Sequence, residues 1–229
     1  MAWTIPKMWK GGTVWIIGSG TSILDEFGIP IELARQVISG DLPISAYSPY
    51  FAPIHNKHTI AINHMYQLGN WLDVFYFSDN EMWSGEENKK QILSYKGLRI
   101  TNNIKFRKLH KGIKYIERDK KEMGLCETKN AVCFNRNTGL SAIDLAYHFG
   151  AKRVILLGFD MASAQIGSHI HGVGTKESKG GSAELSFRSH LKAIPHIIQN
   201  MKDRDIEILN ASSISTIPYF PKVKAKDYF

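Results

Sequence analysis

Short apolar segments that end in small or polar residues recur along the chain and constrain its fold more than any other feature. Four of them lie at Thr13–Ile17, Thr59–Asn63, Val74–Ser78 and Val154–Leu157. Their β-branched and aromatic residues predict buried strands. The segments between these strands have the helical or irregular character of the crossovers that parallel strands require. The pattern therefore predicts an α/β fold with a mostly parallel sheet and helices on both faces.

Weaker patterns complete the expected sheet and its helices. Further strands are expected at 98–101, 113–117 and 206–209, and helices at 30–39, 140–149 and 191–201. The segment 140–149 has apolar residues at helical spacing, and Gly150 follows it as an expected helix end. Residues 41–57 contain three prolines and no helical period, so we expect an irregular connection there.

Length and composition favour one globular domain over residues 1–229. Of the 229 residues, 43% are hydrophobic and 22% are charged, which excludes a mainly disordered chain because enough apolar surface exists for a core. Residues 163–185 contain five glycines, two histidines and no core pattern. We therefore expect this segment to be a mobile lid.

Several classes of protein are disfavoured. The two cysteines, Cys126 and Cys133, are too few for a disulfide framework or a four-cysteine zinc site. No apolar run reaches the roughly 18 residues that a membrane-spanning helix needs. The first twenty residues lack the long apolar core of a signal peptide. We expect a reduced, cytoplasmic setting.

The basic charge of the chain favours anionic partners. The net charge is +8 and the isoelectric point is about 9.4, which suits nucleotides, nucleic acid, phosphorylated sugars or acidic membrane surfaces. Eight lysines and arginines crowd into residues 105–121. Simple solubility explains the same charge equally well, so the partner stays open at this level.

The glycine-rich turn after the first strand is the leading candidate for ligand contact. Gly18-Ser19-Gly20-Thr21-Ser22 follows the strand directly and can bring backbone N–H groups close to a phosphate. The turn matches neither the G-x-G-x-x-G pattern nor the P-loop. A tight turn alone would also select glycines, so nucleotide contact competes with plain turn formation.

Polar residues at the other expected strand ends would face the same crevice, because ligands of parallel sheets bind beyond the carboxyl ends of the strands. Asn63 can hydrogen-bond a nucleotide or simply form a turn. Asp79 and Asp160 can bind a metal or a sugar hydroxyl, or cap the segment that follows. Asn137–Gly139 precedes an expected helix, where Thr138 can cap the helix and exposed N–H groups can meet an anion.

Two histidines in the expected lid are candidate proton acceptors. The spacing of His169 and His171 can bind zinc, but the nearby sequence offers no clear third ligand, so we assign no metal site. Histidine titrates near neutral pH, which suits a general base. An exposed histidine without a role explains the same residues.

The order of these motifs resembles the MptE-like proteins of phages and bacteria. The matching residues are the Gly18–Ser22 turn, Asn63, Asp79, Thr138-Gly139, Val154–Gly158, Asp160, His169, Asn210-Ala211-Ser212 and Phe220-Pro221. The group includes 6-hydroxymethylpterin diphosphokinase-like and flagellin-modification proteins, and its fold looks related to the family 42 sialyltransferases. The resemblance covers roughly Thr13 to Pro221 and implies a Rossmann-like nucleotide-binding transferase.

The resemblance also implies roles for single residues. In sialyltransferase-like members the matching positions hold a cytidine nucleotide; here they are Gly18, Gly20, Ser22, Asn63, Thr138 and Gly139. His169 would be the base. In pterin kinase-like members the crevice holds a nucleoside triphosphate with magnesium, which Asp79 and Asp160 would bind. The chain departs from the usual pattern at Thr21, where proline is common, and in an inserted stretch between Ile23 and Thr59.

These observations yield a set of candidate residues. The candidate catalytic residues are His169 and Asp160. The candidates for nucleotide contact are Gly18, Ser19, Gly20, Thr21, Ser22, Asn63, Asp79, Asn137, Thr138 and Gly139.

Three hypotheses of function follow. The first is a glycosyltransferase-like enzyme that uses a nucleotide-activated sugar such as a CMP-sugar, with His169 as general base. The second is a magnesium-dependent pyrophosphokinase that uses ATP or GTP. The third is a non-catalytic phage protein that binds nucleic acid through residues 105–121.

The partners stay more open than the site. The acceptor could be a sugar, lipopolysaccharide or DNA, and the host cytoplasm is the expected location if a phage encodes the chain. Aromatic residues such as Tyr47 and Tyr219 would suit the interface of a homo-oligomer.

Overall fold

A parallel sheet of seven strands forms the centre of this structure, a computed structural model that describes residues 1–108, 110–162, 167, 169–172 and 183–229. The strands lie in the order β5-β4-β3-β2-β1-β8-β9, and each neighbouring pair is parallel. Their bounds are β1 (Thr13–Ile17), β2 (His58–Ile62), β3 (Val74–Phe77), β4 (Leu98–Thr101), β5 (Ile113–Tyr115), β8 (Arg153–Leu157) and β9 (Glu207–Asn210). A separate pair joins β6 (Glu117–Arg118) to β7 (Ala131–Val132).

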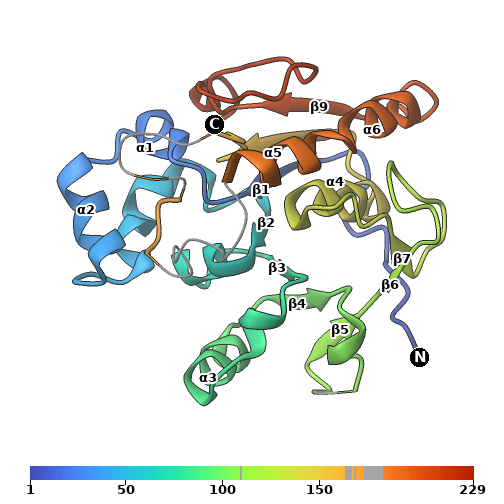
Figure 1. Ribbon diagram of the computed structural model, residues 1–229, viewed down its shortest axis with the longest axis horizontal. Helices are drawn as coiled ribbons and strands as arrows, with labels where there is room; N and C mark the ends of the chain where they lie inside the picture. Colours follow the sequence, from blue (N-terminus) through green and yellow to red (C-terminus); the bar gives the residue numbers. More distant parts are fainter. Residues whose placement is uncertain (109, 163–166, 168, 173–182) are drawn as a thin grey trace.

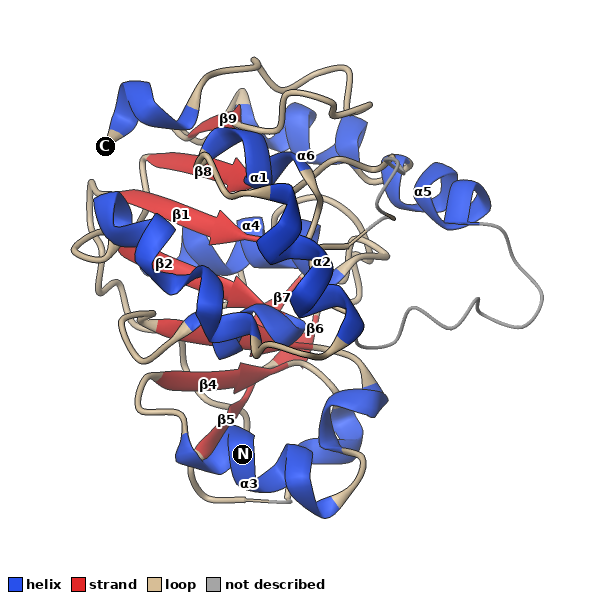
Figure 2. Cartoon of the chain, turned by 90° about the vertical axis from the view of Figure 1, so that its left-hand side faces the viewer, coloured by secondary structure: helices blue, strands red, loops and turns tan. Residues whose placement is uncertain are grey.

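Helices cover both faces of the sheet (Figure 1). Their bounds are α1 (Ser22–Glu26), α2 (Ile31–Ser39), α3 (Glu86–Ser94), α4 (Thr138–Phe149), α5 (Ala183–Leu191) and α6 (Ile194–Met201). Shorter 3-10 segments lie at Ile44–Ile54, Asn63–Leu68, Asn80–Trp83, Ile104–Phe106 and Ala225–Tyr228. Figure 2 shows α1 and α2 in front of the sheet and α4 behind it. None of the helices in the described part of the chain is long and apolar enough to cross a bilayer.

The two faces of β1 belong to two different cores, because successive side chains of a strand point to opposite sides. Val14 and Ile16 join a core with α4 and α6. Trp15 joins a second core with α1, α2 and several 3-10 segments. Burial on both faces explains the uninterrupted apolar sequence of this strand. The predicted α/β fold, a mostly parallel sheet with helices on both faces in one domain, is confirmed.

The order in which the strands are added to the sheet reverses next to β1. The chain builds β2 to β5 on one side of β1 and later adds β8 and β9 on the other side. Thr13 pairs with Arg153 of β8, and Val14 pairs with His58 of β2. The loops after β1 and β8 therefore leave the carboxyl edge side by side, and such a switch point opens a crevice in doubly wound sheets.

Helix α4 begins at this edge and has a clear start and end. Asn137 has extended backbone geometry, and its side chain accepts a hydrogen bond from the N–H of Leu140 at 3.0 Å. The cap is therefore Asn137, whereas Thr138, the expected cap, is the first helical residue. Gly150 ends the helix in the left-handed conformation at φ 94°.

Some expected elements differ from the structure. The strand expected at 113–117 ends at Tyr115, because Glu117 pairs instead with Ala131 of β7. The irregular connection expected at 41–57 contains the 3-10 segment Ile44–Ile54. The helices α3 and α5 were not expected from the apolar spacing. Most of the expected lid, 163–185, lies outside the described residues.

Candidate functional site

The glycine-rich turn after β1 packs directly against the loop after β8. Gly18 N–H donates to the carbonyl of Leu157 at 2.8 Å, and Gly20 N–H donates to the carbonyl of Gly158 at 3.0 Å. A Cβ atom at Gly20 would lie 2.5 Å from Cγ of Asp160 and 2.6 Å from the Gly158 oxygen. The close approach of the two loops therefore requires glycine at this position.

Two backbone N–H groups of the same turn are candidate donors to a ligand. Among the described residues, the backbone N–H groups of Ser19 and Thr21 have no hydrogen-bond partner. Peptide N–H groups near the start of a helix attract anions, and α1 begins at Ser22. The turn can therefore donate to a phosphate while its glycines serve the packing.

Asp160 fixes the conformation of this turn. Its carboxylate accepts hydrogen bonds from the N–H of Ser22 at 3.0 Å and from the Ser22 hydroxyl. The hydroxyl of Thr21 donates to the same carboxylate at 3.4 Å. Only 2% of Asp160 is exposed. A buried carboxylate with these donors holds the β1 turn and the β8 loop together.

His169 also contacts this turn. Its Nδ1 atom is 2.8 Å from the hydroxyl of Ser19. The next residue strengthens the contact, because Ile170 N–H donates to the Ser19 carbonyl at 2.8 Å and the buried Tyr47 hydroxyl donates to the Ile170 carbonyl at 2.9 Å. Burial lowers the pKa of His169, although the nearby charge of Asp160 opposes the shift. A neutral imidazole can accept a proton.

Two more histidines extend this group towards β2. The rings of His169 and His171 are parallel with centroids 5.4 Å apart, and His64 lies 5.1 Å from His171. Burial lowers the pKa of His64, with Asp79 and Glu81 opposing the shift. His64 was not among the expected site residues, although it directly follows Asn63 at a strand end.

Asn63 and Asp79 form the next part of the edge. Asn63 Nδ2 donates to Asp79 Oδ2 at 2.7 Å. Burial raises the pKa of Asp79, and the hydrogen bond from Asn63 opposes this effect. Asn63 adopts φ 48°, an unusual conformation that asparagine tolerates. Its buried Oδ1 atom has no partner among the described residues, so it can accept a hydrogen bond from a ligand.

The start of α4 lies beside the loop after β8. Asn137 Nδ2 lies 3.3 Å from Nδ1 of His190 on α5. A Cβ atom at Gly139 would lie 2.7 Å from the ring of Phe159, so glycine permits α4 to approach the β8 loop. Burial lowers the pKa of His190, and the charge of Asp79 opposes the shift. His190 was missed because α5 was not expected.

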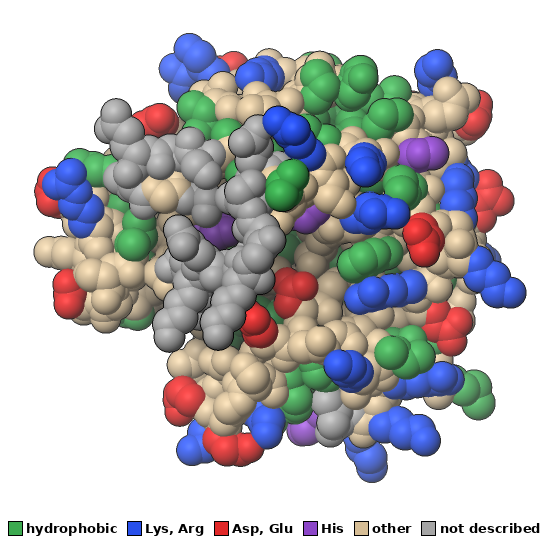
Figure 3. Space-filling model, in the orientation of Figure 1, with side chains coloured by type: hydrophobic (Ala, Val, Ile, Leu, Met, Phe, Trp, Pro, Cys, Tyr) green, Lys and Arg blue, Asp and Glu red, His purple; other side chains and the backbone are tan. Residues whose placement is uncertain are grey.

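The structure thus brings the expected strand ends together at one edge of the sheet. Contacts run from Gly20 to Asp160, from Ser19 to His169, and from Asn63 to Asp79. On the face shown in Figure 3, histidines and acidic side chains lie near the centre, with many lysines and arginines to the right. The carboxyl edge of the sheet thus combines N–H donors, a neutral histidine and carboxylates.

Comparison with known proteins identifies the fold. No protein-family model and no curated protein sequence matches the chain. A solved structure of the MAf glycosyltransferase from Magnetospirillum magneticum AMB-1 matches all of this chain with a TM-score of 0.60 and 14% identity. The match covers 36% of that protein, so the chain spans about a third of its length.

A second solved structure has a similar size. The sialyltransferase CstII from Campylobacter jejuni, solved with the substrate analogue cytidine-5'-monophosphate, has a TM-score of 0.51 and 12% identity. The match covers 94% of this chain and 86% of CstII. At these identities the likeness shows the fold. The expected relation in fold to sialyltransferases is confirmed, and membership of the MptE-like group stays a prediction.

Proposed function

We propose that the protein is a glycosyltransferase that moves a sugar from a nucleotide donor to an acceptor hydroxyl. The observation that carries this proposal is the 2.8 Å contact between the Ser19 hydroxyl and Nδ1 of His169. In this contact, an imidazole whose pKa is lowered by burial meets a turn that has two N–H groups without a partner among the described residues. A proton acceptor and an anion-binding turn are the two parts that sugar transfer from a nucleotide needs.

The donor phosphate binds at the glycine-rich turn. The N–H groups of Ser19 and Thr21 donate to it, and the start of α4 at Thr138 and Gly139 adds the positive end of a helix dipole. Asn63 accepts a hydrogen bond from the base or ribose through its Oδ1 atom, which none of the described residues contacts with a hydrogen bond. Asp160 keeps the turn in its binding conformation.

His169 activates the acceptor. In the tautomer whose Nδ1–H donates to the Ser19 hydroxyl, the Nε2 atom is unprotonated and takes the proton from the acceptor hydroxyl. The hydroxyl oxygen then forms a bond to the anomeric carbon of the sugar. The bond between that carbon and the donor phosphate breaks, and its electron pair leaves with the nucleotide. The N–H groups of the turn stabilise the negative charge of the departing phosphate.

A cytidine monophosphate donor is the first choice for this site. Its support is the shared fold with a sialyltransferase whose solved complex contains that nucleotide. The basic segment 105–121 supports an anionic acceptor such as lipopolysaccharide or DNA, because seven of its eight lysines and arginines are exposed. Several of these residues lie near β5 and β6.

The test combines binding with turnover. Calorimetric titration with CMP, ATP and GTP, each with and without EDTA, identifies the nucleotide. We expect CMP to bind without magnesium and His169→Ala to keep this binding but lose release of CMP from a CMP-sugar. Binding of ATP or GTP only with magnesium would instead support a pyrophosphokinase in which Asp79 and Asp160 hold the ion.

A further inference from the structure

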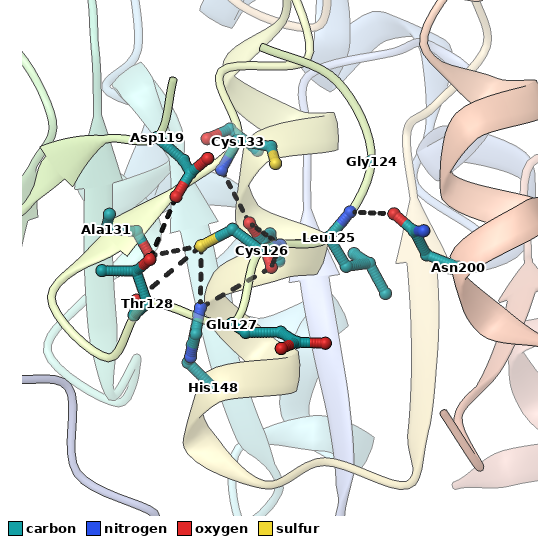
Figure 4. Close-up of polar contacts among 12 residues, drawn as sticks. Asp119, Gly124, Leu125, Cys126, Glu127, Thr128, Ala131, Cys133, His148 and Asn200 are labelled. Carbon is teal, nitrogen blue, oxygen red and sulfur yellow. Dashed lines mark hydrogen bonds and ion pairs between the residues drawn. The ribbon is translucent and has the colours of Figure 1, made fainter. Parts of the chain in front are cut away.

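A second cluster of reactive side chains lies away from the glycine-rich turn, under the segment that joins β6 to β7. Cys126, Asp144 and His148 each offer an atom that can bind a metal, and these atoms all lie within 4.8 Å of one another. Cys126 Sγ is 3.3 Å from His148 Nε2, which is 3.8 Å from Asp144 Oδ1. Figure 4 shows the Cys126 thiol pointing towards the His148 ring.

The sequence places these groups through two elements. Asp144 and His148 are four residues apart in α4 and therefore share one face of the helix. Cys126 belongs to the preceding loop, which other contacts hold in position. Leu125 N–H donates to Asn200 Oδ1 at 2.8 Å (Figure 4), and Gly124 N–H donates to Asn135 Oδ1 at 2.7 Å. The cluster is preformed by the surrounding fold.

The cluster is unusually closed to solvent. Asp144 is fully buried, and the exposed fractions of Cys126 and His148 are 3% and 8%. Asp144 accepts hydrogen bonds from the N–H groups of Cys126 at 3.1 Å and Cys133 at 2.7 Å. A divalent cation at this position would compensate the charge of the buried carboxylate.

We propose that Cys126, Asp144 and His148 bind a zinc ion. A thiolate, an imidazole and a carboxylate are the ligands that zinc takes in proteins, at about 2.0–2.3 Å in tetrahedral geometry. Such ligand atoms lie about 3.3–3.6 Å apart, close to the 3.3 Å and 3.8 Å separations of this cluster. Three protein ligands leave the fourth position to a water molecule or another donor.

Zinc binding replaces one hydrogen-bonded arrangement with another. Without an ion the Cys126 thiol donates to the Ala131 carbonyl at 3.1 Å. On binding, the thiol releases its proton to solvent and the sulfur bonds to zinc. The ion then ties residues 126–133 to α4, whose first turn contains Thr138 and Gly139. This inference is independent of the proposed transfer reaction.

The test measures zinc in the intact protein. After dialysis against zinc and then buffer, we expect elemental analysis and native mass spectrometry to find one zinc ion per chain. Cys126→Ser and His148→Ala should lose it. Cys133→Ser should keep it and is the comparison variant, because Cys133 contacts the Cys126 thiol but lies outside the group of three ligands. Zinc should raise the Tm of the wild type and of Cys133→Ser but not that of Cys126→Ser.

Replacement of zinc by cobalt gives a readout that does not depend on stability. A thiolate-to-cobalt absorption band should appear in the wild type and in Cys133→Ser and be absent in Cys126→Ser. Circular dichroism checks that each variant is folded. Zinc-free wild type that is folded and shows no cobalt band would overturn the proposal. Equal loss of metal from Cys133→Ser would also overturn the three-ligand assignment.

Discussion

The carboxylate of Asp160 accepts hydrogen bonds from both the N–H and the hydroxyl of Ser22, which lies 138 residues earlier in the chain. This contact joins the turn after β1 to the loop after β8 at the switch point of the sheet. Both elements contribute to the candidate site, so the contact connects stability with ligand binding.

Asp160→Asn should destabilise the protein by about 1–3 kcal/mol, because an amide replaces one accepting oxygen and leaves a buried donor unpaired. Urea unfolding measures this change. The exposed Asp25 in α1 gives a matched control, and Asp25→Asn should have little effect. Loss of transfer by Asp160→Asn with unchanged stability would instead assign Asp160 a direct part in the chemistry.

His169→Ala should lower kcat by about 10²–10⁴-fold, the usual contribution of a general base, with little change in donor Kd. The pH profile of the wild type gives a second measurement. Because burial lowers the pKa of His169 in the free protein, the acid limb of kcat/KM should lie below pH 6.5, the ordinary value for histidine. A limb above pH 6.5, or turnover by His169→Ala at the wild-type rate, would contradict the base assignment.

Gly20→Ala should destabilise the fold by about 1–3 kcal/mol and weaken nucleotide binding, because the added methyl group has no room beside Asp160. Gly12→Ala is a milder comparison, since its Cβ would meet the nearest atom at 3.2 Å instead of 2.5 Å. Thermal unfolding and calorimetry with CMP measure the two effects. Equal losses of stability and of CMP binding in the two variants would contradict the conclusion that close packing requires glycine at position 20.

Tyr47→Phe should cost about 0.5–1.5 kcal/mol of stability and lower kcat more than it weakens donor binding, because the lost hydroxyl supports Ile170 beside His169. Tyr50→Phe is the control, as Tyr50 is partly exposed. Comparison of kcat, KM and donor Kd separates this positioning effect from general destabilisation. A change in donor Kd alone would argue against it.

Charge reversal of Lys105 and Lys108 should weaken the binding of an anionic acceptor. The KM for the acceptor should rise at low salt, while the Kd for the donor stays constant. The matched control reverses Lys224 and Lys226, which are also exposed but lie outside the basic segment. Steady-state kinetics at two salt concentrations measures the effect. Similar changes from both pairs would indicate net charge rather than a binding surface.

Local patterns were sufficient to predict the sheet and its polar edge. Apolar strands such as Val154–Leu157 and the turn Gly18–Ser22 carry their information within a few residues, because strand burial and turn geometry are local properties. The α3 helix was missed because its exposed face leaves little apolar period, with Ile92 its buried residue. Long-range pairing decided that the strand from Ile113 ends early.

Contacts within the site were harder to predict from the sequence. The roles of His64, His190 and Tyr47 depend on which segments the fold brings together, and their local sequence gives little sign of it. The cysteine count considered only a four-cysteine zinc site. That argument does not detect a mixed set of ligands such as Cys126, Asp144 and His148, because the first two ligands are 18 residues apart in the sequence.

The central position of β1 has a consequence for how the protein is made. During synthesis β1 emerges well before its partner β8, and until β8 has been added one edge of an apolar strand is without its neighbour. Such distant pairing is slow to form. Chains stalled before β8 should therefore be prone to aggregate and to need chaperones, and the contacts between the turn after β1 and the loop after β8 should form in the final folding step.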